Sequence, residues 1–122
     1  MSKVKIKVSV NDDIEKEYNA IYREKEKLLT YKEEDNTLVK FNYKDNVLIR
    51  ENDSLFMQYK FVNKKTSKNK IFIKDLKQYL DITLFTKSIL VKDNIINITY
   101  VIEDNLFNYK IEVIKDEYYK KN

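Results

Sequence analysis

The chain has 122 residues, a length that suits one domain with a single hydrophobic core. Charged residues make up 36% and hydrophobic residues 43%, which is the balance of a globular protein and not of a disordered one. The chain contains no His, Cys or Gly, which excludes the commonest general base, a thiolate nucleophile, a nitrogen or sulfur metal site and a glycine-rich phosphate loop. We therefore expect no enzyme activity, no cofactor and no metal.

The composition also indicates an origin and a location. Gly and Pro are absent and nearly all basic residues are Lys, as expected for a bacterial protein from a very AT-rich genome. No apolar run approaches the length of a membrane span, and residues 2–10 alternate polar and apolar side chains, unlike a secretory signal. We expect a cytoplasmic protein with no membrane partner.

Alternation of apolar and polar residues with a period of two dominates the chain and predicts an antiparallel sheet or a closed barrel. The first alternating run covers 4–10, and later runs begin at Thr37, Leu55, Leu80, Ile96 and Phe107. The apolar face of the later runs is the predicted interior. Its members are Thr37, Val39, Phe41, Tyr43, Leu55, Met57, Tyr59, Phe61, Leu80, Ile82, Leu84, Ile96, Ile98, Tyr100, Ile102, Phe107, Tyr109, Ile111 and Val113.

Segment 14–31 has two interpretations. Its apolar residues recur at near-helical spacing behind Asp13, a plausible N-cap, which favours an amphipathic helix. As strands it would cover 14–24 and 27–33 and carry three residues on one face, Tyr18, Ala20 and Tyr22. The local pattern leaves both interpretations open.

Without glycine, the turns need another residue that tolerates positive φ, and Asn is the next best. Asp-Asn lies between alternating runs at 35–36, 45–46, 93–94 and 104–105. A two-residue turn at 104–105 would put Tyr100 opposite Tyr109 and Ile98 opposite Ile111, all on one face. We expect a hairpin there.

Arg50 follows the turn at 45–46, and its direction depends on that turn. A two-residue turn would put Phe41 opposite Arg50 and direct the guanidinium into the barrel, whereas a turn that includes Lys44 would direct it outward. A buried Arg must be paired or bind an anion, because an isolated buried charge is very costly. An ion pair is the favoured interpretation over a ligand contact.

Residues 63–77 hold six lysines and one acid, with Phe61, Phe72 and Tyr79 nearby. We interpret them as a solvated lysine-rich loop, although the alternation of Ile71 and Ile73 is typical of a strand. The alternative is a surface that binds RNA or an RNA-associated protein, with weak and sequence-independent nucleic acid binding at most. The basic patch would comprise Lys64, Lys65, Lys68, Lys70, Lys74 and Lys77.

A family resemblance begins at Leu28 and extends to the end of the last alternating run. The residues that carry it are LLTYKEEDNTLVKFNYKDNVLIREN, FMQYKF, ITLFTKSI and IINITYVIEDNLFNYKIEVI. They resemble the YwiB-like family, small bacterial proteins of unknown function with a calycin-like (lipocalin-like) β-barrel. The matching positions are Tyr31, Glu33, Glu34, Arg50, Phe61, Thr86 and Lys87. The chain departs from the family at Glu51-Asn52, where a glycine is usual, and at 74–78, where the family has a different turn.

The resemblance implies that 14–31 forms two strands. The expected fold is then an all-β, antiparallel meander barrel of about eight to ten strands, calycin-like, spanning 1–122 as one domain with a frayed tail at 116–122. Such a barrel holds a filled interior or one small ligand, here partly apolar or anionic. The candidate ligand-binding residues are Arg50, Phe41, Tyr43, Tyr59, Tyr100 and Tyr109. Because the inward set is rich in bulky aromatics, we expect a mostly packed barrel with a small polar pocket at one end.

Overall fold

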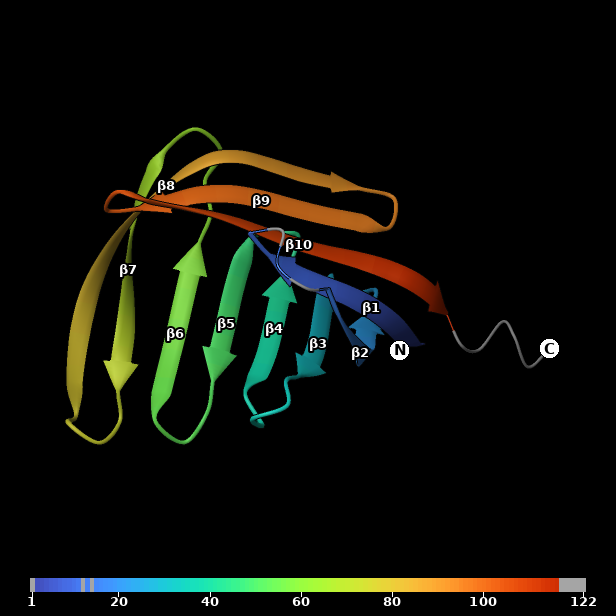
Figure 1. The fold of residues 1–122 in the computed structure, drawn as a ribbon, viewed down its shortest axis with the longest axis horizontal. Coiled ribbons are helices and arrows are strands. Elements are labelled where there is room, and N and C mark those ends of the chain that lie inside the picture. The colour runs from blue at the N-terminus through green and yellow to red at the C-terminus, as the bar shows by residue number, and fades with distance from the viewer. Residues whose placement is uncertain (1, 12, 14, 117–122) are drawn as a thin grey trace.

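Ten antiparallel strands close into a barrel in the computed structural model, which describes residues 2–11, 13 and 15–116. The strands are β1 (Ser2–Val10), β2 (Lys16–Arg23), β3 (Leu28–Lys32), β4 (Leu38–Asn42), β5 (Val47–Glu51), β6 (Leu55–Lys60), β7 (Thr66–Ile73), β8 (Gln78–Lys92), β9 (Ile95–Ile102) and β10 (Asn105–Asp116). Each strand pairs with the next along the chain, and β1 pairs with β10 to close the barrel (Figure 1). The all-β meander barrel predicted from the sequence is confirmed.

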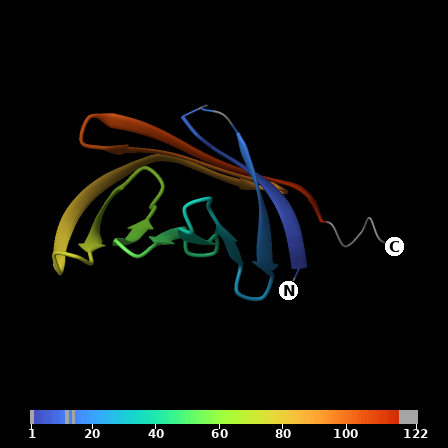
Figure 2. The same ribbon diagram turned by 60° about the horizontal axis from the view of Figure 1, so that its bottom comes forward.

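The strands differ in length, and the long ones bend around the interior. β8, β9 and β10 curve over one side of the barrel, and the short strands β3 to β6 form the other side (Figure 2). Two irregularities help the curvature, one in the pairing of β1 with β10, where β10 has an extra residue opposite Lys5 and Ile6, and one in β8 between Thr86 and Ser88. Bulges of this kind increase local twist, which a closed barrel requires.

Segment 14–31 contains β2 and the start of β3, joined by a turn at 24–27, and none of its described residues is helical. β2 pairs with β1 on one side, with Tyr18 opposite Ile6, and with β3 on the other. Ala20 is buried, and Tyr18 and Tyr22 on the same face pack against the core. Pairing on both edges and burial of alternate residues therefore override the helical spacing.

The turns use residues other than glycine at positive φ. Asn36 and Asn46 have φ values of 67° and 58°, as expected for the first two Asp-Asn turns. In the third turn the left-handed residue is Asp93 rather than Asn94. The Asn94 side chain instead donates a hydrogen bond of 3.0 Å to the carbonyl of Val113.

The β9–β10 hairpin has the predicted faces but not the predicted register. Its turn is Glu103-Asp104, so Tyr109 lies opposite Ile98 and not Tyr100. The observed register puts Asn108 on the outer face opposite Thr99, where its amide donates to Thr99 Oγ1 at 2.8 Å and to Asn97 Oδ1 at 2.8 Å. A shift of two residues preserves the inner face, so the hydrophobic pattern could not choose between the two registers.

The core fills the barrel with one cluster of buried side chains. It contains Val4, Ile6, Val8, Ala20, Leu29, Tyr31, Val39, Phe41, Leu48, Tyr59, Phe61, Leu84, Ile96, Ile98, Tyr100, Tyr109 and Ile111. Leu55 and Leu80, which we expected inside, are 39% and 47% exposed. They lie where β6 begins and near the start of β8, at the rim of the barrel, where few opposing side chains cover them. Asp116 is the last residue of β10, and the rest of the predicted tail, 117–122, lies outside the described residues.

Candidate functional site

The middle of the barrel is packed with aromatic rings. The Phe61 ring lies 5.1 Å from the Tyr100 ring and 6.4 Å from the Tyr59 ring, between centroids. Tyr100 also stacks on Phe107 at 5.3 Å, and Phe41 is fully buried. Burial raises the pKa of Tyr100 to about 12. Of the candidate ligand-binding residues, Phe41, Tyr59 and Tyr100 therefore lie within this core.

Arg50 lies on the inner face of β5, opposite Val39, and its guanidinium forms an ion pair with the carboxylate of Glu33. The turn before β5 has four residues, Tyr43 to Asn46, and the expectation that a turn including Lys44 directs Arg50 outward is wrong. The turn is two residues longer than the predicted Asp45-Asn46 turn, which keeps the inner face, so Phe41 opposes Leu48 instead of Arg50. Burial acts to lower the pKa of Arg50, but the Glu33 carboxylate outweighs it and the pKa is raised. The inward direction and the ion pair are the two features of Arg50 that the structure establishes.

Three tyrosines surround this ion pair. The hydroxyls of Tyr31 and Tyr109 are 2.7 Å apart and share a buried hydrogen bond. Tyr18 stacks on Tyr31 with centroids 5.2 Å apart and donates to Glu34 at 3.0 Å. Burial raises the pKa of Tyr31, Tyr109 and Tyr18, that of Tyr18 to about 12 with a contribution from Glu34.

A hollow of about 330 Å³ opens beside this cluster, and we call it the Arg50 pocket. It is lined by Val8, Ser9, Val10, Asp13, Lys16, Tyr18, Glu33, Glu34, Asp35 and Arg50. Glu33 neutralises Arg50, and Lys16 pairs with Glu34 at 3.2 Å. Four carboxylates against two basic groups give the lining a net negative charge, which disfavours an anionic ligand.

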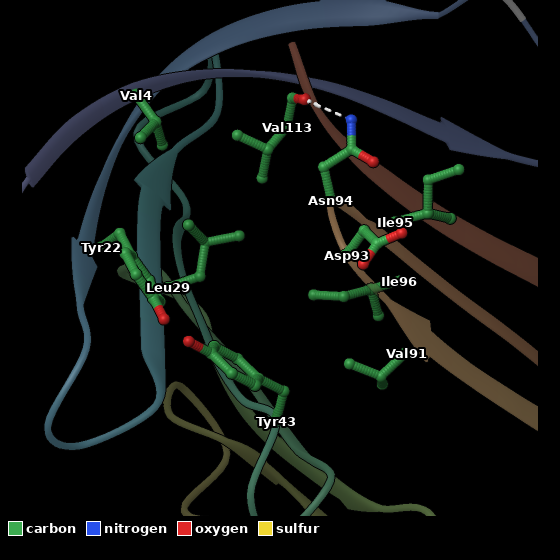
Figure 3. A pocket seen from close by; sticks show the side chains of 10 residues that line it. All are labelled: Val4, Tyr22, Leu29, Tyr43, Val91, Asp93, Asn94, Ile95, Ile96 and Val113. Carbon is green, nitrogen blue, oxygen red and sulfur yellow. Dashed lines mark hydrogen bonds between the residues drawn. The ribbon is translucent and has the colours of Figure 1, made fainter. Parts of the chain in front are cut away.

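The opposite end of the barrel has a smaller and more apolar hollow of about 240 Å³, which we call the Tyr43 pocket (Figure 3). It is lined by Val4, Tyr22, Leu29, Tyr43, Val91, Asp93, Asn94, Ile95, Ile96 and Val113. The end of β2 brings Tyr22 to the pocket, and the turn after β4 brings Tyr43. That turn is fixed by Asn42 Oδ1, which accepts from the backbone N–H groups of Lys44 and Asp45 at 3.0 Å each.

The Tyr43 hydroxyl oxygen is buried and has no partner at hydrogen-bonding geometry among the described residues, although the Tyr22 hydroxyl lies beside it. Its ring stacks beside that of Tyr22 with centroids 5.8 Å apart, and the two hydroxyls point toward each other (Figure 3). Burial, with a contribution from the neighbouring Tyr22 hydroxyl, raises the pKa of Tyr43. A buried hydroxyl oxygen without a hydrogen-bonded partner is unusual in a native protein and is available to bond a ligand.

The candidate ligand-binding residues are thus divided among three places. Arg50 and Tyr109 lie at one end, Tyr43 lies at the other, and the remaining three lie in the core between them. Sequence reasoning did not include Tyr22 among the candidates, although its predicted face with Tyr18 and Ala20 gave a signal for it. The sequence did not identify Val91 as an inward residue, because the bulge in β8 reverses which of the following side chains face inward.

The interpretation of 63–77 as a loop is wrong for most of its length, because residues 66–73 form β7. Its lysines are spread along the strand and the turns at both of its ends. Lys64 and Lys65 precede β7, Lys68 and Lys70 point outward from it, and Lys77 follows it, all five being exposed. Lys74 is not free, since its ammonium lies 2.8 Å from the Glu51 carboxylate.

Within the described ranges, no group of three or more Asp or Glu side chains could hold a metal ion. None of the described residues forms a helix that is long and apolar enough to cross a membrane.

No family model and no curated protein matches the chain. Among solved structures, it is similar to the YwiB protein of Bacillus subtilis, with a TM-score of 0.60 and 19% sequence identity over 93% of this chain and 91% of that chain. A likeness at this identity shows the fold alone. The chain therefore has a ten-stranded barrel fold similar to that of YwiB.

Proposed function

We propose that the protein is a non-enzymatic binding barrel that takes a small, mostly apolar molecule with one hydrogen-bonding group in the Tyr43 pocket. The observation that carries the proposal is the buried Tyr43 hydroxyl without a partner, in the wall of a hollow lined mainly by apolar side chains. An unpartnered buried polar group costs about 1–3 kcal/mol. A ligand that inserts between the Tyr22 and Tyr43 hydroxyls and bonds them removes that cost.

The size of the pocket limits the ligand. At about 240 Å³ it lies below the usual range of drug-sized sites. An apolar cavity of about 150 Å³ can hold benzene, so the Tyr43 pocket suits a single ring with a short substituent. The Arg50 pocket is the weaker candidate, because Glu33 already neutralises Arg50 and the remaining carboxylates repel an anion.

We further propose that the chain belongs with the YwiB-like, calycin-like barrels and functions in the bacterial cytoplasm. The family proposal is supported by the matching positions Tyr31, Glu33 and Arg50 together with the similar fold. The location is supported by the cysteine-free composition, since disulfides mark proteins of oxidising compartments.

Calorimetric titration with benzyl alcohol tests the ligand proposal. Its roughly eight non-hydrogen atoms at about −0.5 kcal/mol each correspond to a Kd near 1 mM for the wild-type protein. Tyr43→Phe keeps the ring but removes the hydroxyl, so the affinity should fall about three- to tenfold. Val91→Trp should abolish binding by filling the pocket.

Tyr18→Phe is the matched control, because it removes a tyrosine hydroxyl at the Arg50 pocket and should leave the affinity unchanged. Toluene, which lacks the hydroxyl, should bind the wild type and Tyr43→Phe equally. Binding that Tyr18→Phe weakens and Val91→Trp leaves intact would contradict the proposed site. A wild-type protein that binds neither compound below about 10 mM would contradict the function.

A further inference from the structure

The positive charge of the protein is concentrated in one part of the barrel, made of β6, β7 and the first residues of β8. Residues 55–81 contain seven lysines and two aspartates, a net charge of +5, whereas the whole chain carries +4. The rest of the chain is therefore slightly acidic. Because these three strands pair in sequence, they form one continuous wall of the barrel (Figure 1).

The outer face of this wall carries a row of aromatic side chains. Phe56, Phe72 and Tyr79 occupy successive positions across the three strands. They point outward, because side chains alternate along a strand and the alternate residues Met57 and Tyr59 in β6 and Ile82 in β8 face the core. Tyr79 is 65% exposed, and the centroid of its ring lies 4.8 Å from that of Phe72.

Lysines lie beside the aromatic row on the same face. Lys70 Nζ lies 5.4 Å from the centroid of the Tyr79 ring, within cation–π distance. Lys60 and Lys68 are exposed and share the outward alternation of Lys70. Asp81 pairs with Lys70 across β7 and β8. Among the described residues of β6, β7 and β8, it is the one acidic residue on this face. The face is thus both aromatic and net positive.

We infer that the outer face of β6, β7 and the first four residues of β8, Gln78 to Asp81, binds single-stranded nucleic acid. Exposed rings stack with unpaired bases of any sequence, and the lysines contact the phosphates between them. The two bases of a duplex pair are already stacked and cannot reach Tyr79, so the face distinguishes single strands from duplexes. An acidic peptide would satisfy the lysines but leave the aromatic row without a partner.

Fluorescence anisotropy with a labelled 12-residue oligothymidylate, and with a 12-base-pair duplex, tests this inference on the full chain. We expect the single strand to bind at 50 mM NaCl and the duplex to bind at least tenfold more weakly. Tyr79→Ala should weaken single-strand binding about tenfold, within the range measured for one stacked base. Phosphate contacts by Lys60, Lys68 and Lys70 should give a slope of log affinity against log salt of about −2.

Two matched controls keep the result specific. Phe85→Ala removes another outward aromatic from β8, and Lys32→Ser with Lys40→Ser removes two exposed lysines from β3 and β4. Neither should change single-strand affinity by more than about twofold, whereas Lys68→Ser with Lys70→Ser should reduce the salt slope to about −0.7.

The inference is overturned if the oligothymidylate does not bind at 50 mM NaCl, or if the duplex or a poly-glutamate peptide binds equally well. Binding that the Lys68 and Lys70 substitutions weaken but Tyr79→Ala leaves unchanged would also overturn it, because that result shows charge attraction without stacking.

Discussion

Removal of one hydroxyl from the Tyr31–Tyr109 pair should destabilise the protein more than removal of both. The two side chains are only 3% and 6% exposed, and their hydroxyls are 2.7 Å apart. Tyr31→Phe or Tyr109→Phe alone leaves the other hydroxyl buried without a partner, which costs about 2 kcal/mol. The double variant replaces both hydroxyls by apolar groups in rings of the same shape, which can be nearly neutral. We therefore expect the double variant to be more stable than either single variant.

Equilibrium unfolding in urea measures this difference. With a slope of about 2 kcal/mol per molar, each single variant should lower the midpoint by about 1 M, and the double variant by less than about 0.3 M. Tyr18→Phe is the control, since its hydroxyl bonds the exposed Glu34 and its loss should cost under about 0.5 kcal/mol. Additive losses in the double variant would refute the reasoning, because they would mean that each hydroxyl has a separate partner.

Three further predictions concern the stability of the protein and are tested by unfolding in urea. Lys77→Gly relieves a left-handed φ of 51° and should raise the free energy of unfolding by up to about 1 kcal/mol, and with it the urea midpoint. Lys70→Gly within β7 should lower both. Burial raises the pKa of Tyr100 from its ordinary value near 10 to about 12. The stability that the neutral Tyr100 side chain contributes is therefore complete below pH 10 and is lost as the pH rises through 12. Urea midpoints measured between about pH 8 and 12 will show this loss. Arg50→Met leaves the half-buried Glu33 carboxylate without its partner and should lower the free energy of unfolding by about 1 kcal/mol in the same assay, a value discounted for the 42% exposure of the Arg50 side chain. Adding Glu33→Gln to Arg50→Met should recover part of that loss.

The sequence predicted which side chains face the interior better than it predicted which residues pair between neighbouring strands. Alternation identified Tyr100, Tyr109 and Ile111 as inward residues, and all three are buried. It could not distinguish a turn at Glu103-Asp104 from one at Asp104-Asn105, because both registers keep the same inner face. The choice depends on contacts across the outer face, such as the hydrogen bonds of Asn108, which no hydrophobic pattern records.

The Arg50 end was more predictable than the Tyr43 pocket. The ion pair of Arg50 follows from the cost of an unpaired buried charge. Its inward direction was left open by the sequence, because that direction depends on the length of the turn before β5. The Tyr43 pocket instead depends on barrel closure, which brings Tyr22 and Tyr43 against Val91 and Ile96 from the other side. The bulge in β8 sets which of its later side chains face inward, and the sequence gives no sign of where the strand will bulge.

Fluorine NMR of the protein labelled with 3-fluorotyrosine tests the central claim most directly, because described tyrosines lie at both ends of the barrel and in the core between them. Tyr22 and Tyr43 report on the Tyr43 pocket, Tyr18 and Tyr31 on the Arg50 pocket, and assignment follows from single Tyr→Phe variants. On titration with benzyl alcohol, the resonances of Tyr22 and Tyr43 should shift together and saturate near a Kd of about 1 mM, while those of Tyr18 and Tyr31 stay fixed. Shifts confined to Tyr18 and Tyr31, or no saturable shift at any tyrosine, would contradict the account.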